Sequence, residues 1–156
     1  YYLQWDRRWG QNKYTDDNIA INGCGPTSMA MVISGLLKDN SITPVELAKY
    51  EEYSEKSGTG WEYFTEIPKK YGIKVKELST NEKIYKNELK NGRPIIANVG
   101  PGDFSSTGHY IVLVGVDEDG MFIINDSNSP TNTNEKWSFE RLRSQIKNSW
   151  SFVKGE

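Results

Sequence analysis

The sequence predicts an α+β fold in which helices come first and a mostly antiparallel β-sheet follows. Apolar residues recur with a helical period in the first half of the chain, and β-branched residues gather in short runs in the last third. Helices and strands that are segregated in this way are typical of α+β proteins. The chain has 156 residues and shows no internal repeat or linker, so we expect one domain spanning residues 1–156.

The strongest helical pattern starts beside the single cysteine, Cys24. Pro26 suits the first position of a helix, where its missing N–H costs no hydrogen bond. Over residues 29–37 the apolar side chains are spaced three and four apart, which predicts one buried helix face. The 23 residues before this helix have no clear period. We expect them to form an irregular segment that Trp5 and Trp9 hold in place.

Turn and breaker residues place the remaining elements. Thr43, Pro44 and Glu46 form a capping-box signature at the start of a second helix. Gly72 ends a third helix, and Asn91 begins the turn that ends a fourth. The segment 127–136 is expected to be a polar loop. The expected helices after the second cover residues 61–71, 82–90 and 138–147, and the expected strands cover residues 73–78, 94–99, 110–116, 121–125 and 150–153.

The overall composition excludes several classes of function. The formal net charge is −2, which gives no indication of a nucleic-acid or anionic-membrane partner. No apolar run approaches the ~20 residues that a membrane-spanning helix needs, so we expect no membrane insertion. One cysteine and one histidine leave no cluster with zinc-ligand spacing. We therefore expect neither a metal nor a cofactor.

The chain begins at Tyr1 and not at a methionine. This start predicts a domain excised from a longer protein, with any targeting segment already removed. We therefore expect other modules in the parent chain.

Cys24 stands where thiol chemistry is favoured. It lies at or just before a helix start, where unpaired N–H groups and the helix dipole favour negative charge and lower a thiol pKa from its reference near ~8.5. The flanking Gly23 and Gly25 permit a close approach of backbone. The alternative is a small hydrophobic residue buried in a turn. A thiol nucleophile also needs a base, and the single imidazole is that of His109.

The hairpin that follows His109 supplies a candidate partner, Asp126. If residues 117–120 form a four-residue loop, Val116 pairs with Met121. That register places Asp126 diagonally opposite His109 and on the same face, because side chains alternate along a strand. A carboxylate there could orient the imidazole and stabilise its charged form. A shift of one residue would move Asp126 to the opposite face.

Other residues could take part in such a site. An amide can also orient an imidazole, but parity places Asn125 on the other face; Asp103 and Asp117 are further alternatives. An acyl-transfer enzyme needs hydrogen-bond donors for the developing oxyanion, and the backbone N–H of Cys24 is one candidate. The second is usually a side-chain amide. The amides that precede the cysteine, among which the residues alone do not choose, are Gln4, Gln11, Asn18 and Asn22.

At these residues the chain resembles the family thirty-nine type of cysteine peptidases within the papain-like superfamily, relatives of the bacterial peptidases that cut double-glycine leader peptides. The resemblance rests on GCGPTSMAMVISGLL around Cys24, GRPIIANVG before the histidine, GHYIVLVGVDEDGMFIINDSNS around His109 and Asp126, and the opening QWDRRWG. It covers nearly the whole chain. It implies a papain-like fold, with the nucleophile at the start of a central helix and the His and Asp on the sheet facing it.

The resemblance also implies the roles of the site residues. Cys24 corresponds to the nucleophile, His109 to the general base and acid, and Asp126 to the orienting residue. Gln4 of QWDRRWG is similar to the oxyanion-hole glutamine. Papain-like enzymes often carry that glutamine six residues before the cysteine, and in this chain that position is Asn18.

The expected reaction is hydrolysis of an amide bond in a peptide-like substrate through a thioester. Stand-alone relatives look like cell-wall-directed peptidases or amidases, so the first expectation is a peptide or muropeptide partner at an extracellular or cell-surface location, secreted by a bacterium or borne by a phage. The alternatives are a protease that processes proteins or leader peptides, an acyltransferase, and a silent peptide-binding module. The expected substrate-binding residues are Gly23, Gly25, Trp61, Phe104 and Gly108.

Overall fold

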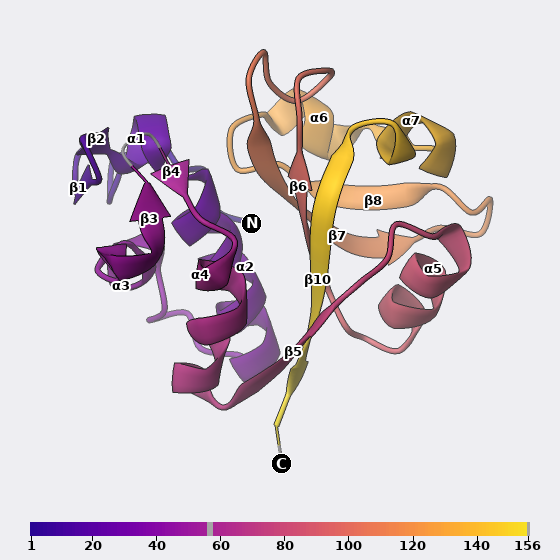
Figure 1. The fold of residues 1–156 in the computed structure, drawn as a ribbon, viewed down its shortest axis with the longest axis horizontal. Coiled ribbons are helices and arrows are strands. Elements are labelled where there is room, and N and C mark those ends of the chain that lie inside the picture. Colours follow the sequence, from indigo (N-terminus) through magenta and orange to yellow (C-terminus); the bar gives the residue numbers. More distant parts are fainter. Residues whose placement is uncertain (56–57, 156) are drawn as a thin grey trace.

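The computed structural model describes residues 1–55 and 58–155, and it has the predicted α+β architecture (Figure 1). The first half of the chain (indigo to magenta) forms a helical part on one side of the molecule. This part contains α1 (Ile19–Asn22), α2 (Cys24–Leu37), α3 (Pro44–Ala48), η1 (Glu51–Tyr53), α4 (Glu62–Glu66) and η2 (Pro68–Tyr71), together with the two-stranded ribbons β1 (Lys13–Tyr14) with β2 (Asp17–Asn18) and β3 (Ser54–Glu55) with β4 (Gly58–Thr59).

The second half forms an antiparallel sheet beside the helical part. Within the described residues the sheet has six strands in the order β5-β10-β6-β7-β8-β9. The long strand β10 pairs with β5 on one side and with β6 on the other. The elements are β5 (Ile73–Glu77), α5 (Glu82–Lys90), β6 (Ile95–Val99), β7 (His109–Val116), β8 (Phe122–Asn125), α6 (Pro130–Asn134), β9 (Lys136–Trp137), α7 (Phe139–Arg143) and β10 (Ile146–Lys154).

Each face of the sheet carries an apolar core, because successive side chains of its strands point to opposite faces. On one face Val112 of β7 joins a cluster with Met29 and Ile33 of α2. On the other face Ile111 joins a cluster with Tyr85 of α5. Each large apolar side chain that is buried in this way contributes about 1.5–3 kcal/mol. The strand β7 is thus fixed between two cores, and α2 is fixed against it.

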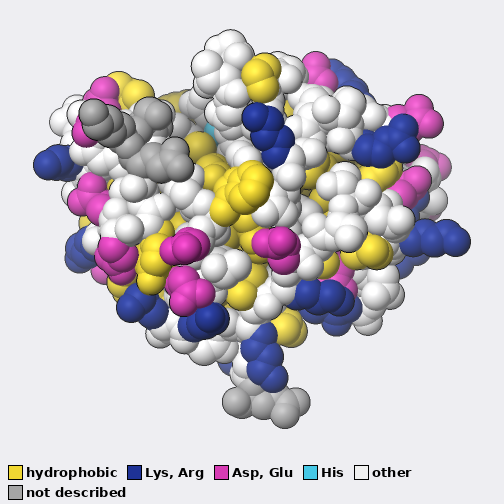
Figure 2. Space-filling model, viewed as in Figure 1, with side chains coloured by type: hydrophobic (Ala, Val, Ile, Leu, Met, Phe, Trp, Pro, Cys, Tyr) yellow, Lys and Arg dark blue, Asp and Glu magenta, His cyan; other side chains and the backbone are white. Residues whose placement is uncertain are grey.

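The surface is mixed in character. Charged side chains of both signs cover the face in Figure 2, and apolar side chains are exposed near its middle. In the part of the chain that the structure describes, no helix combines the length and the apolar character that crossing a membrane requires.

Most of the predicted elements are present. The helix predicted at 82–90 is α5 with the same bounds, and Asn81 caps it by accepting a hydrogen bond from the Ile84 N–H. The helix beside Cys24 is α2, whose interior residues are buried. Gly72 ends the third helical segment with φ +72°, a left-handed conformation that favours glycine. The predicted strands all form, and only β10 is much longer than expected.

Five predictions about the elements are wrong. The Thr43 hydroxyl makes no cap hydrogen bond, so the capping box does not form. The third helix is divided into α4 and η2 at Pro68, which has no N–H to continue the ladder. The predicted loop 127–136 contains α6 and β9, and the helix predicted at 138–147 is the shorter α7. The opening segment contains β1, β2 and α1, and Trp9 is buried there whereas Trp5 is 48% exposed.

The hairpin β7–β8 differs from the predicted register at its turn and agrees with it further on. Val116 pairs with Phe122 and not with Met121, because the turn is one residue longer than expected. A bulge between Leu113 and Gly115 then adds one residue to β7, and Val112 pairs with Asn125. The extra residue in β7 offsets the extra residue in the turn. Asp126, which follows β8, therefore lies on the face of the sheet that was predicted for it.

Candidate active site

Cys24 is the first residue of α2 and is half-buried. The residues on either side of it allow other elements to approach closely. A side chain at Gly23 would place its Cβ 2.4 Å from the Ile19 carbonyl oxygen, and one at Gly25 would place its Cβ 2.3 Å from Oγ1 of Thr59 in β4. Glycine at both positions therefore lets α1 and β4 pack around the start of α2.

His109 is the first residue of β7 and contacts both Cys24 and Asp126. Its Nε2 lies 2.6 Å from Oδ1 of Asp126. Its ring is also hydrogen-bonded to the Cys24 thiol. Because Nε2 is engaged by the carboxylate, Nδ1 is the ring nitrogen left for the sulfur. Side chains from α2, from β7 and from the segment after β8 thus form one hydrogen-bonded chain.

The Asp126 carboxylate is fully buried and held by further donors. Its Oδ1 also accepts the backbone N–H of Asn128 at 2.9 Å, and its Oδ2 accepts the amide of Asn132 at 3.1 Å. The backbone N–H of Asp126 donates to Oγ1 of Thr133 at 2.9 Å. Asn132 and Thr133 belong to α6, so an element that the sequence analysis missed fixes the carboxylate. Ser129, whose side chain caps α6, was a signal for this helix.

The electrostatics of the three side chains favour a thiolate–imidazolium pair. Burial raises the pKa of the Cys24 thiol, but the hydrogen bond and charge of His109 and the backbone N–H groups of Tyr110 and Gly25 outweigh it and leave this pKa below its usual value. Burial lowers the pKa of His109, yet Asp126 and Cys24 outweigh it and raise this pKa to about 10. Burial raises the pKa of Asp126, and His109 more than reverses the effect. At neutral pH the shared proton therefore belongs on the imidazole.

Gln4 lies in the same pocket as Cys24, with its amide held in a fixed orientation. Its Oε1 accepts the Ser127 hydroxyl at 2.8 Å, and its Nε2 donates to the Ala20 carbonyl at 3.0 Å. A primary amide nitrogen has two N–H bonds. Within the described residues only the one to Ala20 is used, so a second donor is available to a ligand in the pocket.

The other three amides are engaged elsewhere or exposed. Asn18 caps α1 by accepting the Ile21 N–H at 3.1 Å. Asn22 lines the pocket of Cys24, but its amide donates to Thr15 Oγ1 at 2.9 Å. Gln11 is exposed and lies outside that pocket. Gln4 and Asn22 both line the pocket, and Gln4 is the one whose amide is held at both its oxygen and its nitrogen.

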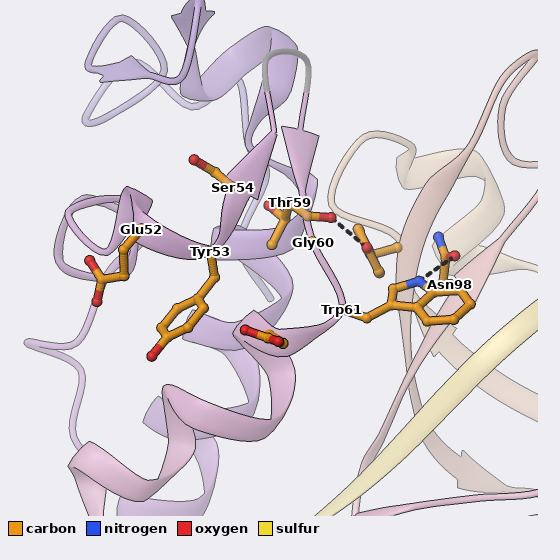
Figure 3. A pocket seen from close by; sticks show the side chains of 9 residues that line it. Glu52, Tyr53, Ser54, Thr59, Gly60, Trp61 and Asn98 are labelled. Atoms are coloured by element: carbon orange, nitrogen blue, oxygen red, sulfur yellow. Dashed lines mark hydrogen bonds between the residues drawn. The ribbon is translucent and has the colours of Figure 1, made fainter.

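Two pockets lie in this region: Cys24 and His109 line the first, and Tyr110, which follows His109 in β7, lines the second. The catalytic pocket has a volume of about 500 Å³ and is lined by residues that include Gln4, Cys24, Phe104, Gly108, His109 and Asn128. The acidic pocket has a volume of about 610 Å³ and is lined by residues that include Glu52, Tyr53, Thr59, Trp61, Glu62, Asn98 and Tyr110 (Figure 3).

The predicted substrate-binding residues are divided between these places. Phe104 and Gly108 line the catalytic pocket, and Trp61 lines the acidic pocket. Gly23 and Gly25 line neither, and the structure uses them for close packing. The sequence analysis did not single out Asn98 or Tyr110, because the contacts that bring them to the site are distant in sequence.

The rival partners of His109 lie elsewhere. Asn125 lines a separate pocket with Met31 of α2. The Asp103 carboxylate accepts hydrogen bonds from Arg141 at 3.1 Å and from Gln145 at 2.9 Å, and Asp117 pairs with Lys136. Across residues 1–55 and 58–155, no three His, Cys, Asp or Glu side chains are grouped as a metal site requires.

Comparisons with known proteins agree with this geometry. The family model described as the Peptidase_C39 like family matches residues 1–156. No curated protein sequence matches the chain significantly. Among solved structures, the peptidase domain of ComA from Streptococcus, a bi-functional ABC transporter of a quorum-sensing pathway, is 24% identical with a TM-score of 0.63 over 85% of this chain and 91% of that chain.

Two further solved structures share the fold. A C39-like peptidase from Bacillus anthracis is 17% identical with a TM-score of 0.64 over 99% of this chain and 94% of that chain. A double glycine motif protease from an AMS/PCAT transporter, solved in complex with a leader peptide, is 17% identical with a TM-score of 0.54 over 83% of this chain and 84% of that chain. The chain therefore belongs to the Peptidase_C39 like family and is a cysteine peptidase with a papain-like fold.

Proposed function

We propose that Cys24, His109 and Asp126 form the catalytic triad of this peptidase, and that its substrate is a peptide segment of a protein, such as a leader peptide. The observation that carries the proposal is the hydrogen-bonded chain from the Cys24 thiol through His109 to the buried Asp126 carboxylate. Cysteine and histidine occur once each in the sequence, so no second pair could replace them.

In the proposed mechanism the Cys24 thiolate attacks the carbonyl carbon of the scissile amide. The negative charge that develops on the carbonyl oxygen is stabilised by the backbone N–H of Cys24 and by the free N–H of Gln4. His109 then gives its proton to the departing amine, and a thioester remains on Cys24. Neutral His109 next takes a proton from water, which attacks the thioester and releases the acid.

Asp126 has a positioning role in this scheme. It accepts a hydrogen bond from the Nε2–H of His109, so it keeps Nδ1 directed at the sulfur and stabilises the imidazolium. Asn128 and Asn132 hold the carboxylate in turn. The arrangement makes the ion pair the resting state, so the enzyme would begin with its nucleophile already ionised.

The comparisons support a protein-derived peptide over the cell-wall substrate that the sequence analysis placed first. Two of the solved structures named above are peptidases of transporters, and one of them holds a leader peptide. None of the three is named as a cell-wall enzyme. A peptidase domain spanning residues 1–156 is part of the proposal, and the extent of the family match supports it.

The test compares the two substrate classes directly. The protein and a Cys24→Ala variant are incubated in parallel with a library of proteome-derived peptides and with purified peptidoglycan, and new termini are identified by mass spectrometry. We expect new peptide termini with the protein and none with the variant. New termini in peptidoglycan alone would overturn the proposed substrate class and favour an extracellular, cell-wall role. Amide products that appear on addition of an amine would identify an acyltransferase.

A further inference from the structure

We propose that the acidic pocket binds a positively charged side chain, that of a lysine or arginine, at a fixed position of the peptide substrate close to the scissile bond. The proposal rests on the proposed function, because it assumes that a peptide crosses the site of Cys24. It adds a selectivity for charge that the fold and the catalytic pair do not require.

The first argument is the position of the pocket. Tyr110, which lines it, directly follows His109 in β7. Thr59 lines the pocket too, and its side chain lies against Gly25, the residue after Cys24. A peptide advances about 3.3 Å per residue when extended. A substrate carbonyl held at Cys24 therefore brings a residue a few positions away to the acidic pocket.

The second argument is that one wall of the pocket is already in place. The Trp61 indole N–H donates to Oδ1 of Asn98 at 3.0 Å (Figure 3), and the Asn98 amide donates to the backbone carbonyl of His109 at 3.1 Å. The Trp61 ring also meets Trp150 edge-on, with ring centroids 6.3 Å apart. Trp61 nevertheless remains 49% exposed. An indole that is fixed and solvent-facing gives a ligand a preformed aromatic surface.

The third argument is the charge of the lining. Glu52 and Glu62 are exposed and line the pocket together with Tyr53 and Trp61, whereas no lysine or arginine of the described residues lines it. Within the described residues neither carboxylate takes part in an ion pair or hydrogen bond.

These features together match one kind of side chain. Lysine and arginine have a long apolar stem that can lie on an aromatic ring and a cationic head that carboxylates attract. A cation over an aromatic face is itself favourable. An acidic side chain would be repelled by both glutamates.

The experiment compares the protein with a Glu52→Gln/Glu62→Gln double variant. Both digest the same synthetic peptide library, and residue frequencies are counted at each position around the cleaved bonds. A Glu118→Gln/Glu140→Gln variant is the matched control, since it removes the same charge from exposed residues outside both pockets. We expect lysine and arginine to be enriched at one position by the protein and the control, and not by the double variant.

A defined peptide from that library then measures the effect. Replacing its lysine by norleucine, which keeps the stem and removes the charge, should lower kcat/KM by roughly 10-fold for the protein and by less than about 2-fold for the double variant. The difference should shrink at high salt. Cleavage without enrichment of basic residues, or enrichment that the double variant retains, would overturn the proposal and leave the proposed function standing.

A binding measurement separates the two hypotheses if no peptide is cleaved. Immobilised Cys24→Ala protein captures peptides from the synthetic library, and the captured sequences are compared with those held by the Cys24→Ala variant that also carries Glu52→Gln and Glu62→Gln. Enrichment of lysine and arginine by the first protein alone supports the acidic pocket even though the proposed function has failed. Equal capture by the two proteins, or capture by neither, overturns it.

Discussion

Nε2 of His109 and Oδ1 of Asp126 lie 2.6 Å apart although the two residues are 17 positions apart in the chain. Two local features bring them together. The bulge between Leu113 and Gly115 of β7 offsets the longer β7–β8 turn, which would otherwise have moved Asp126 to the opposite face of the sheet. The short helix α6 then supplies Asn132, which holds the other carboxylate oxygen. The contact therefore depends on the register of β7 with β8 and on the short helix α6.

The first prediction concerns Asp126→Asn. The amide keeps the shape of the side chain and removes the charge that helps to raise the pKa of His109 to about 10. A base with a raised pKa stays protonated up to that pKa, so the alkaline limit of activity should move to lower pH in the variant. We expect kcat/KM to fall by about 10²–10⁴-fold. The pH profile of kcat/KM with a cleaved peptide measures both effects.

A matched variant controls for the loss of any acidic residue. Asp103→Asn removes a carboxylate that pairs with Arg141 outside the catalytic pocket, so its pH profile should equal that of the unaltered protein. An alkaline limit that stays in place in Asp126→Asn would show that another group sets the protonation of His109.

The second prediction concerns the oxyanion donor. Gln4→Ala should lower kcat by about 10²–10³-fold, because the donor acts on the charge that develops during reaction. KM should change little. The reaction of Cys24 with iodoacetamide should also change little, since Gln4 is not among the groups that lower the thiol pKa. Steady-state kinetics and the alkylation rate separate the two effects.

Asn18 is the natural comparison, because it stands six residues before the cysteine. Its side chain caps α1, so Asn18→Ala should lower the free energy of unfolding by about 1 kcal/mol and leave kcat unchanged. A larger loss of kcat in Asn18→Ala than in Gln4→Ala would reverse the assignment of the oxyanion donor.

The third prediction tests the packing around the nucleophile. Gly25→Ala would place a methyl group 2.3 Å from Oγ1 of Thr59, and the bond of that hydroxyl to Tyr14 at 2.6 Å resists its displacement. We expect a loss of about 1–3 kcal/mol in the free energy of unfolding. Gly35→Ala lies in the same helix with nothing within 4 Å, so it should gain about 0.5–1 kcal/mol. Urea denaturation measures both, and equal changes would contradict this account.

The sequence predicts well those elements whose signals are local. The spacing of apolar residues gives α2, and the turn that begins at Asn91 gives the end of α5. Such signals come from residues three or four positions apart, so they can be recognised in the sequence without the structure. The placement of Cys24 at a helix start follows from the same kind of evidence.

The features that the sequence did not predict depend on distant contacts. The bulge in β7 depends on how β8 pairs with it, and the position of Asp126 was right because this bulge offset an error in the turn. In α6 the four residues after Pro130 are polar and give no apolar period, so only Ser129 and Pro130 mark the start of this helix. The Trp61–Asn98 bond joins residues 37 apart, and no local pattern indicates it.

The last prediction concerns the ionisation of Cys24 itself. The chain has one cysteine, so its intact mass reports alkylation at a single site. His109 lowers the thiol pKa, and the thiolate is the reactive form. We expect iodoacetamide to react with the protein at pH 6 at least about 10-fold faster than with an ordinary thiol, of which only about 0.3% is ionised at that pH.

The His109→Ala variant should lose this faster reaction at pH 6. Its alkylation rate should instead rise about tenfold per pH unit up to about pH 8, as the thiol ionises. Circular dichroism checks that the variant is folded. An unaltered protein whose rate rises in the same way across this range would show that the thiol is neutral at rest, and that His109 must first remove its proton.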